Sequence, residues 1–179
     1  MAKKKLKYYI PGAIALLFGI AAFCMMFLTA INFNAGDTTS EGWTGAQIVF
    51  GHKEDVPLIG EVTVLNFNFL ALLAFALPLI GGVLALVFKN GLITKIVTTA
   101  CFVAGAVLLF CLVAYSGLGR VSLEGENIIE QGINEFLSSL YDGIDSTKSL
   151  AAGPIVGGIL SALGAFVCLF KGTIAKAIK

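Results

Sequence analysis

The chain has 179 residues, of which 58% are hydrophobic and 13% are charged, and its formal net charge at pH 7 is +1. A soluble domain of this size would lack the polar surface needed to cover so many apolar side chains, so the composition excludes that class and favours a membrane protein. The basic residues form short patches beside the predicted spans, which argues against nucleic acid as a partner. The lipid bilayer is therefore the first predicted partner.

Four uncharged runs predict the helices that cross the bilayer. The predicted spans cover residues 8–31, 66–88, 96–118 and 150–170. A helix needs about 20 apolar residues to cross a hydrocarbon core of about 30 Å, and each run is long enough. A basic segment precedes the first run, as in a signal peptide. The run is longer than the apolar region of about 7 to 15 residues in such peptides and lacks a clear cleavage site, so we expect an uncleaved helix.

Charge is sorted between the connections of these spans. Nine of the 12 Lys and Arg residues lie before the first span, between the second and third spans, and after the fourth. All 11 Asp and Glu residues lie in the other two connections, residues 32–65 and 116–149. Because Lys and Arg are enriched on the cytoplasmic side, we predict cytoplasmic termini and two acidic loops outside the plasma membrane. Residues 1–179 then form a single four-span domain.

The first outer loop contains two short segments that favour strands. Ala46–Phe50 and Glu61–Leu65 are rich in β-branched and aromatic residues and are separated by a turn-forming stretch, so they predict an antiparallel hairpin. Such a hairpin is marginal alone and needs a backing surface. Trp43 and Phe50 are the aromatic residues that we predict to bind a partner protein. The alternative is that both rings pack inside the cap, on a helix of the second loop.

The second outer loop predicts that helix, over Ile129–Ile144. Its apolar residues recur with the period of an α-helix, and Phe136 and Tyr141 lie on the apolar face. The face either covers the hairpin as a lid or docks another protein, and both interpretations stay open. We count Phe136 and Tyr141 among the predicted partner-binding residues.

Small residues recur every four positions along the fourth predicted span. They are Gly153, Gly157, Ser161 and Ala165. Such a stripe allows two helix backbones to approach closely, so these residues are predicted to pack against another helix. That helix belongs either to the same chain or to a partner.

The sequence contains no pattern typical of catalysis, cofactor binding or metal binding. The four cysteines, Cys24, Cys101, Cys111 and Cys168, lie in the predicted spans at unrelated spacings, which favours a packing role. His52 is the only histidine, and it has no partner at the spacing of a triad or a metal site. The spans lack the ionisable residues that proton relays and ion-coupled carriers need. We therefore predict a protein that is not an enzyme and has no cofactor.

The predicted layout resembles that of the claudin-like tetraspan membrane proteins. The shared features are four spans, both termini inside, and a first outer loop that bears strands and a tryptophan. In motif terms the resemblance covers Gly42-Trp43 alone, because the Gly-Leu-Trp motif and the two loop cysteines of that family are absent here. The resemblance implies a non-enzymatic membrane protein that presents an outer domain.

Together these features predict an all-α transmembrane four-helix bundle with a small extracellular cap, made of a short β-hairpin and an amphipathic helix. The predicted function is that of an accessory or structural subunit. Its acidic cap would bind other membrane, envelope or extracellular proteins, or further copies of the chain. An oligomeric channel or transporter component is the alternative.

Overall fold

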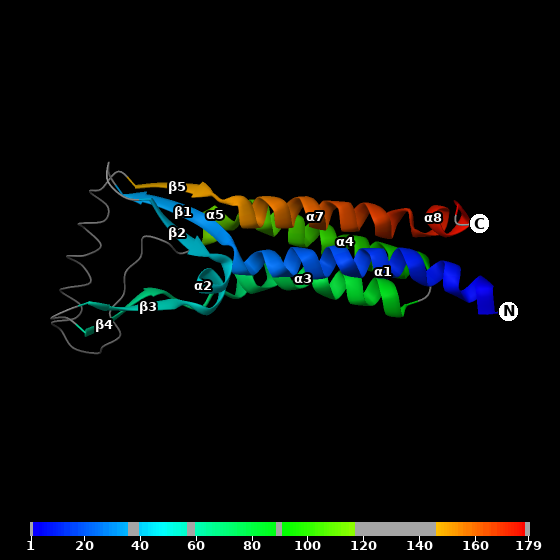
Figure 1. The fold of residues 1–179 in the computed structure, drawn as a ribbon, viewed down its shortest axis with the longest axis horizontal. Coiled ribbons are helices and arrows are strands. Elements are labelled where there is room, and N and C mark those ends of the chain that lie inside the picture. The colour runs from blue at the N-terminus through cyan, green and yellow to red at the C-terminus, as the bar shows by residue number, and fades with distance from the viewer. Residues whose placement is uncertain (1, 36–39, 57–59, 89–90, 117–145, 178–179) are drawn as a thin grey trace.

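The computed structural model describes residues 2–35, 40–56, 60–88, 91–116 and 146–177. Four long helices lie side by side, with the strands beyond one end of them (Figure 1). The helices are α1 (Ala2–Cys24), α3 (Phe69–Val87), α4 (Leu92–Phe110) and α7 (Ala152–Leu169). Each contains an apolar stretch long enough to cross a membrane, which confirms the prediction of four such helices.

The four helices form a closed ring, in which each packs against two neighbours in the order α1, α3, α4, α7 and back to α1. Glycines bring the main chains of α1 and α3 together. A Cβ atom placed on Gly19 of α1 would lie 2.5 Å from the carbonyl oxygen of Pro78, and one placed on Gly82 of α3 would lie 2.8 Å from the Cα atom of Leu16. Cβ atoms do not approach main chain this closely, so only glycine fits at both positions.

Helix α7 packs on α4 through small residues and a hydrogen bond. Gly164 faces the ring of Phe102. The buried hydroxyl of Ser161 donates to the carbonyl oxygen of Phe102 at 2.7 Å. This bond satisfies a polar group in the middle of an apolar contact, where an unpaired hydroxyl would be costly.

Side-chain hydrogen bonds fix the helix ends that face the strands. Asn68 caps α3, because its Oδ1 accepts from the Ala71 N–H at 3.1 Å. Its Nδ2 donates at 2.6 Å to the carbonyl oxygen of Tyr115, the last residue of α5 (Leu112–Tyr115). The Tyr115 hydroxyl donates to the carbonyl oxygen of Leu108 at 2.5 Å.

A three-stranded antiparallel sheet joins parts of the chain that are far apart in sequence. Helix α1 leads through a short 3₁₀ helix, η1 (Met25–Phe27), into β1 (Thr29–Ala35). Strand β1 lies between β2 (Ser40–Thr44) and β5 (Ser146–Leu150), and its Ile31 is opposite Trp43 on one side and Leu150 on the other. None of these three strands was predicted from the sequence. They tie the connection before α3 to the one before α7.

The predicted strand over Ala46–Phe50 is wrong, because this segment is the helix α2 (Gly45–Phe50). The Thr44 hydroxyl accepts from the Gln47 N–H at 3.2 Å, and Gln47 Oε1 accepts from the Thr44 N–H at 2.9 Å. This reciprocal capping box starts a helix and outweighs the β-branched side chains. Strand β4 (Gly60–Leu65) does contain the predicted Glu61–Leu65, but it pairs with β3 (His52–Val56). The predicted helix over Ile129–Ile144 lies outside the described residues.

One hydrophobic core joins the strands to the helices. It contains Ile31 of β1, Trp43 of β2, Ile48 of α2, Phe75 of α3 and Leu112 of α5. Each of these side chains is buried. The strand end therefore packs directly on the ends of the helices and shares its core with them.

At the other end of the bundle, α8 (Lys171–Ala177) carries a buried lysine. The Lys171 ammonium donates to the carbonyl oxygen of Ala85 at 2.5 Å and to that of Phe88 at 3.3 Å. The last carbonyls of a helix lack partners within it and attract positive charge, so Lys171 serves as a cap for α3. Burial lowers the pKa of Lys171; the nearby Cys168 thiol opposes this shift and Lys95 adds to it.

Replacing Lys171 with methionine is expected to lower the free energy of unfolding by about 1–3 kcal/mol, because the buried carbonyl oxygen of Ala85 loses its donor. Lys95→Met is the matched control. It removes a lysine that disfavours the charge on Lys171, so stability should be unchanged or slightly higher. Thermal unfolding in detergent measures both variants. Equal losses would contradict the capping role of Lys171.

Candidate functional site

Trp43 lies inside the strand end of the molecule. Strand β2 places it opposite Ile31 of β1, and the indole ring is only 7% exposed. It meets the ring of His52 from β3 edge to face, with 5.5 Å between ring centroids and 67° between ring planes. This pair connects the two sheets, because β2 belongs to one and β3 to the other. Trp43 is therefore a core residue, and its ring is not available to a partner.

The indole N–H of Trp43 has no hydrogen-bond partner among the described residues. A buried N–H group normally finds an acceptor, since leaving one unpaired costs about 1–3 kcal/mol. The ring nevertheless contributes a large apolar surface to the core. Packing is thus its established role in this structure.

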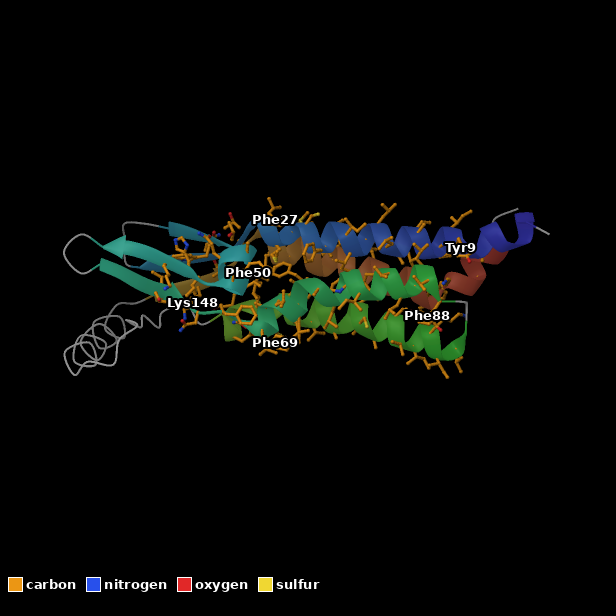
Figure 2. All side chains as sticks on the ribbon, turned by 90° about the horizontal axis from the view of Figure 1, so that it is seen from below. Tyr9, Phe27, Phe50, Phe69, Phe88 and Lys148 are labelled. Atoms are coloured by element: carbon orange, nitrogen blue, oxygen red, sulfur yellow. The ribbon has the colours of Figure 1, made fainter. Side chains whose placement is uncertain are left out.

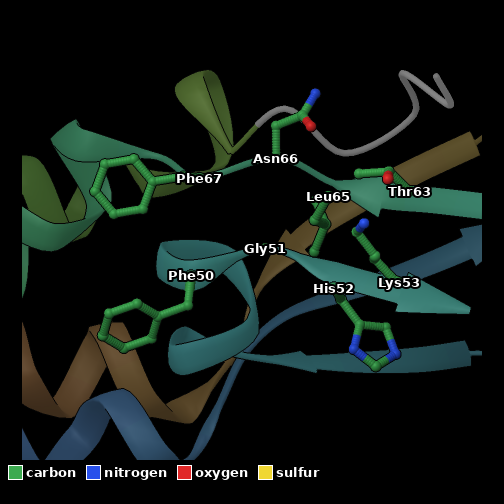
Figure 3. Close-up of a pocket in the computed structure, with 8 residues that line it drawn as sticks. All are labelled: Phe50, Gly51, His52, Lys53, Thr63, Leu65, Asn66 and Phe67. Atoms are coloured by element: carbon green, nitrogen blue, oxygen red, sulfur yellow. The ribbon is translucent and has the colours of Figure 1, made fainter. Parts of the chain in front are cut away.

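Phe50, the second predicted anchor, is 62% exposed. It is the last residue of α2, and the chain leaves this helix through Gly51, whose φ is +86°. A Cβ atom at Gly51 would also lie 2.6 Å from the carbonyl oxygen of Leu65. Both the positive φ and this close approach require glycine. The turn leaves the Phe50 ring pointing toward the helices and away from the strands (Figure 3).

A shallow cavity of about 210 Å³ lies where α2, the base of the β3–β4 pair and the start of α3 meet. We call it the junction hollow. Its lining residues are Phe50, Gly51, His52, Lys53, Thr63, Leu65, Asn66 and Phe67. The rings of Phe50 and Phe67 lie on the side of the helices, whereas Lys53 and Thr63 lie on the side of the strands (Figure 3). The hollow is thus apolar at one side and polar at the other.

Exposed aromatic side chains mark two levels along the bundle (Figure 2). Phe27, Phe50 and Phe69 lie near the strand end of the helices, and Tyr9 and Phe88 lie near the opposite end. Such rings are enriched at the two interfaces between a bilayer and water. The two levels indicate where headgroup regions would lie, with the strands beyond one of them.

The four residues of the predicted packing stripe are buried. A Cβ atom on Gly153 would lie 2.8 Å from the carbonyl oxygen of Thr29, and one on Gly157 would lie 3.3 Å from Leu109. Ser161 bonds to α4, as described above, and Ala165 packs in a core cluster with Phe102. The stripe thus lies against helices and strands of the same chain. The predicted partner-binding residues Phe136 and Tyr141 lie outside the described residues.

Several residues of this architecture were not singled out by the sequence analysis. They are Gly19 and Gly82 between α1 and α3, Lys171 at the end of α3, and Lys53 and Phe67 in the junction hollow. One of these had a local signal: Gly19 follows Gly12 by seven residues, so the two glycines fall on one face of α1. The roles of Lys171 and Lys53 depend on contacts between distant segments.

Within the part of the chain that the structure describes, no three His, Cys, Asp or Glu side chains come together in a metal-binding group. No known protein family matches the sequence, and neither a curated protein nor a solved structure is detectably similar to the chain.

Proposed function

We propose that this chain is a non-enzymatic accessory or structural subunit of the plasma membrane, with cytoplasmic termini and a strand end that binds another protein outside the cell. The observation that carries the proposal is that the strands pack on the helices and share one hydrophobic core with them. Ile31, Trp43 and Phe75 share one core, and the Ala151 N–H donates to the Ala30 carbonyl oxygen at 2.9 Å where β5 leads into α7. A binding surface that is already ordered loses little freedom on association.

Charge indicates the kind of partner. The connections over residues 32–65 and 116–149 carry 3 basic and 11 acidic residues, a net charge of −8. A partner with a basic surface would be attracted, and its association would weaken as salt screens charges farther apart than about 8 Å. The claudin-like layout stays a prediction, and so does the helix over residues 129–144. No junction-forming activity is proposed.

A photo-crosslinking residue at Ser149 tests the binding proposal in the native membrane. Ser149 is exposed on β5, and Val103, exposed on α4, is the matched control in the helices. We expect a defined adduct from Ser149 and not from Val103, with a yield that falls as salt rises. The double change Asp55→Asn and Glu61→Gln, at positions paired between β3 and β4, should reduce the yield.

Two results would contradict this proposal. One is an adduct of equal yield from both positions, since lipid-facing contacts would then explain it. The other is an adduct that contains only further copies of this chain, which would favour the oligomeric channel or transporter instead. A salt-independent adduct would contradict the role of charge.

Orientation is tested by labelling single cysteines in a background without the four native ones. We expect a cysteine at Ser149 to react with a membrane-impermeant thiol reagent in intact cells, because the acidic connections are predicted to be outside. A cysteine at Leu92, exposed at the start of α4 at the other end of the bundle, should react only after permeabilisation. Reaction of the Leu92 position alone in intact cells would reverse the proposed orientation.

A further inference from the structure

Two lysines from different helices lie at the same level at the end of the bundle that is remote from the strands. Helices α4 and α7 run in opposite directions (Figure 1), and Gly164 of α7 faces Phe102 of α4. Seven residues make about two helical turns and return to the same face. Lys95 comes seven residues before Phe102, and Lys171 comes seven residues after Gly164. Only Phe170 separates α7 from α8, so Lys95 and Lys171 follow this contact on neighbouring helices.

The charge of this lysine pair is not balanced by the chain. Lys171 is buried, and the acceptors of its ammonium group, the carbonyl oxygens of Ala85 and Phe88, are neutral. Lys95 is half-buried, and its ammonium group has no hydrogen bond or ion pair with any residue that the structure describes. The two lysines repel each other, since Lys95 contributes to the lowered pKa of Lys171. All 11 acidic residues belong to the connections 32–65 and 116–149, so the neighbouring sequence supplies no Asp or Glu.

The start of α4 makes an anion still more favourable beside Lys95. The first turn of α4 contains no acidic residue, and its N-cap, Gly91, provides no side-chain hydrogen bond. A cation near a helix N-terminus is disfavoured by the helix dipole, whereas an anion is favoured there. A negative group beside Lys95 would therefore offset both the repulsion from Lys171 and the unfavourable dipole.

The depth of the pair indicates where such an anion comes from. Phe88, whose carbonyl oxygen accepts from Lys171, is one of the exposed rings that mark this end of the bundle, together with Tyr9 (Figure 2). Aromatic rings of this kind lie at the headgroup level of a bilayer, where the lipid phosphates are. Leu92 and Ile96, on either side of Lys95 in α4, are 75% and 60% exposed. The charged site thus adjoins an apolar surface suited to acyl chains.

We propose that Lys95 and Lys171 together bind the phosphate group of an anionic phospholipid, from the leaflet at the end of the bundle remote from the strands. Lys95 donates to the phosphate. Lys171 adds its charge and has one N–H beyond the two that its carbonyl acceptors need. The acyl chains lie along Leu92 and Ile96. This inference depends neither on the partner protein proposed above nor on the orientation of the chain, because a lipid is recognised at the opposite end of the bundle from the strands.

Native mass spectrometry of the full chain in mild detergent tests this site. Phosphatidylglycerol and phosphatidylcholine with the same acyl chains are added separately, and we expect preferential binding of phosphatidylglycerol. Lys95→Gln should weaken that binding about fivefold, whereas Lys95→Arg should preserve it. Lys176→Gln is the matched control, since it removes an equal charge from α8, and it should change binding by less than about twofold.

Thermal unfolding provides a second readout of the same variants. Phosphatidylglycerol should raise the melting temperature of the unaltered chain above its value in phosphatidylcholine, because the bound anion relieves the repulsion between the lysines. Lys95→Gln should lose this difference, while its melting temperature in phosphatidylcholine stays unchanged or rises slightly.

Three results would overturn the proposal. Equal effects of Lys95→Gln and Lys176→Gln would show that net charge, and not this pair, attracts the lipid. Equal binding of the two lipids would show that the negative charge is not recognised. Displacement of phosphatidylglycerol by millimolar inorganic phosphate would show that the lysines bind free phosphate and that the lipid is not the ligand.

Discussion

Trp43→Ala is expected to lower the free energy of unfolding by about 3–5 kcal/mol, the cost of removing a large buried aromatic side chain. The ring is 7% exposed and lies in the core shared by β1, α2 and α3, so its loss leaves a cavity between the strands and the helices. It also removes the edge-to-face contact with His52. Thermal or denaturant unfolding in detergent, followed by circular dichroism, measures the change.

Phe50→Ala is the matched control. It also removes an aromatic ring close to His52 in sequence, but this ring is 62% exposed. Its replacement should change stability by less than about 0.5 kcal/mol. A large loss in both variants would mean that Phe50 also supports the core. A negligible loss in Trp43→Ala would contradict the joint core of strands and helices.

Gly19→Ala is expected to lower stability by about 1–3 kcal/mol or more, because even one methyl group has no space between α1 and α3. The added Cβ would lie 2.5 Å from the carbonyl oxygen of Pro78, and α1 would have to move away from α3 along its length. Gly19→Leu should prevent folding of the bundle. Melting temperature and the yield of monodisperse protein in detergent report both changes.

Gly157→Ala provides the comparison within the predicted packing stripe. Its Cβ atom would lie 3.3 Å from Leu109 Cδ1, the movable end of a side chain, and alanine favours a helix over glycine by about 1 kcal/mol. The cost of the close contact with Leu109 and the gain in helix propensity nearly cancel, so we expect little change in stability. A larger loss at Gly157 than at Gly19 would show that the contact between α1 and α3 is looser than the structure describes.

The helices could be predicted from the sequence because the bilayer sets their length and composition. Each span is a long apolar run, and no contact between distant residues is needed to recognise it. The choice between strand and helix for α2 could also have been made correctly. Thr44 and Gln47 form the spacing of a capping box, a local signal for a helix start that the β-branched residues of the segment obscured.

Other features depend on where the chain returns in space. The sequence of β5, Ser146–Leu150, has little strand character of its own, and it is a strand because it pairs with β1. Lys171 was predicted only as part of a basic patch, although folding places its ammonium group against the carbonyls at the end of α3. The junction hollow likewise combines residues from α2, both strands of the β3–β4 pair and the segment before α3. No local pattern predicts such combinations.

The position of β5 in the three-stranded sheet has a consequence for synthesis. Strand β1 leaves the ribosome directly after α1, but the neighbour on its second side follows only after α3 and α4. Until then one edge of β1 keeps its N–H and C=O groups unpaired, and such an edge pairs readily with the wrong strand. Final closure of the sheet therefore waits for most of the chain to be made, and this interval is when a chaperone or a neighbouring nascent chain has access to β1.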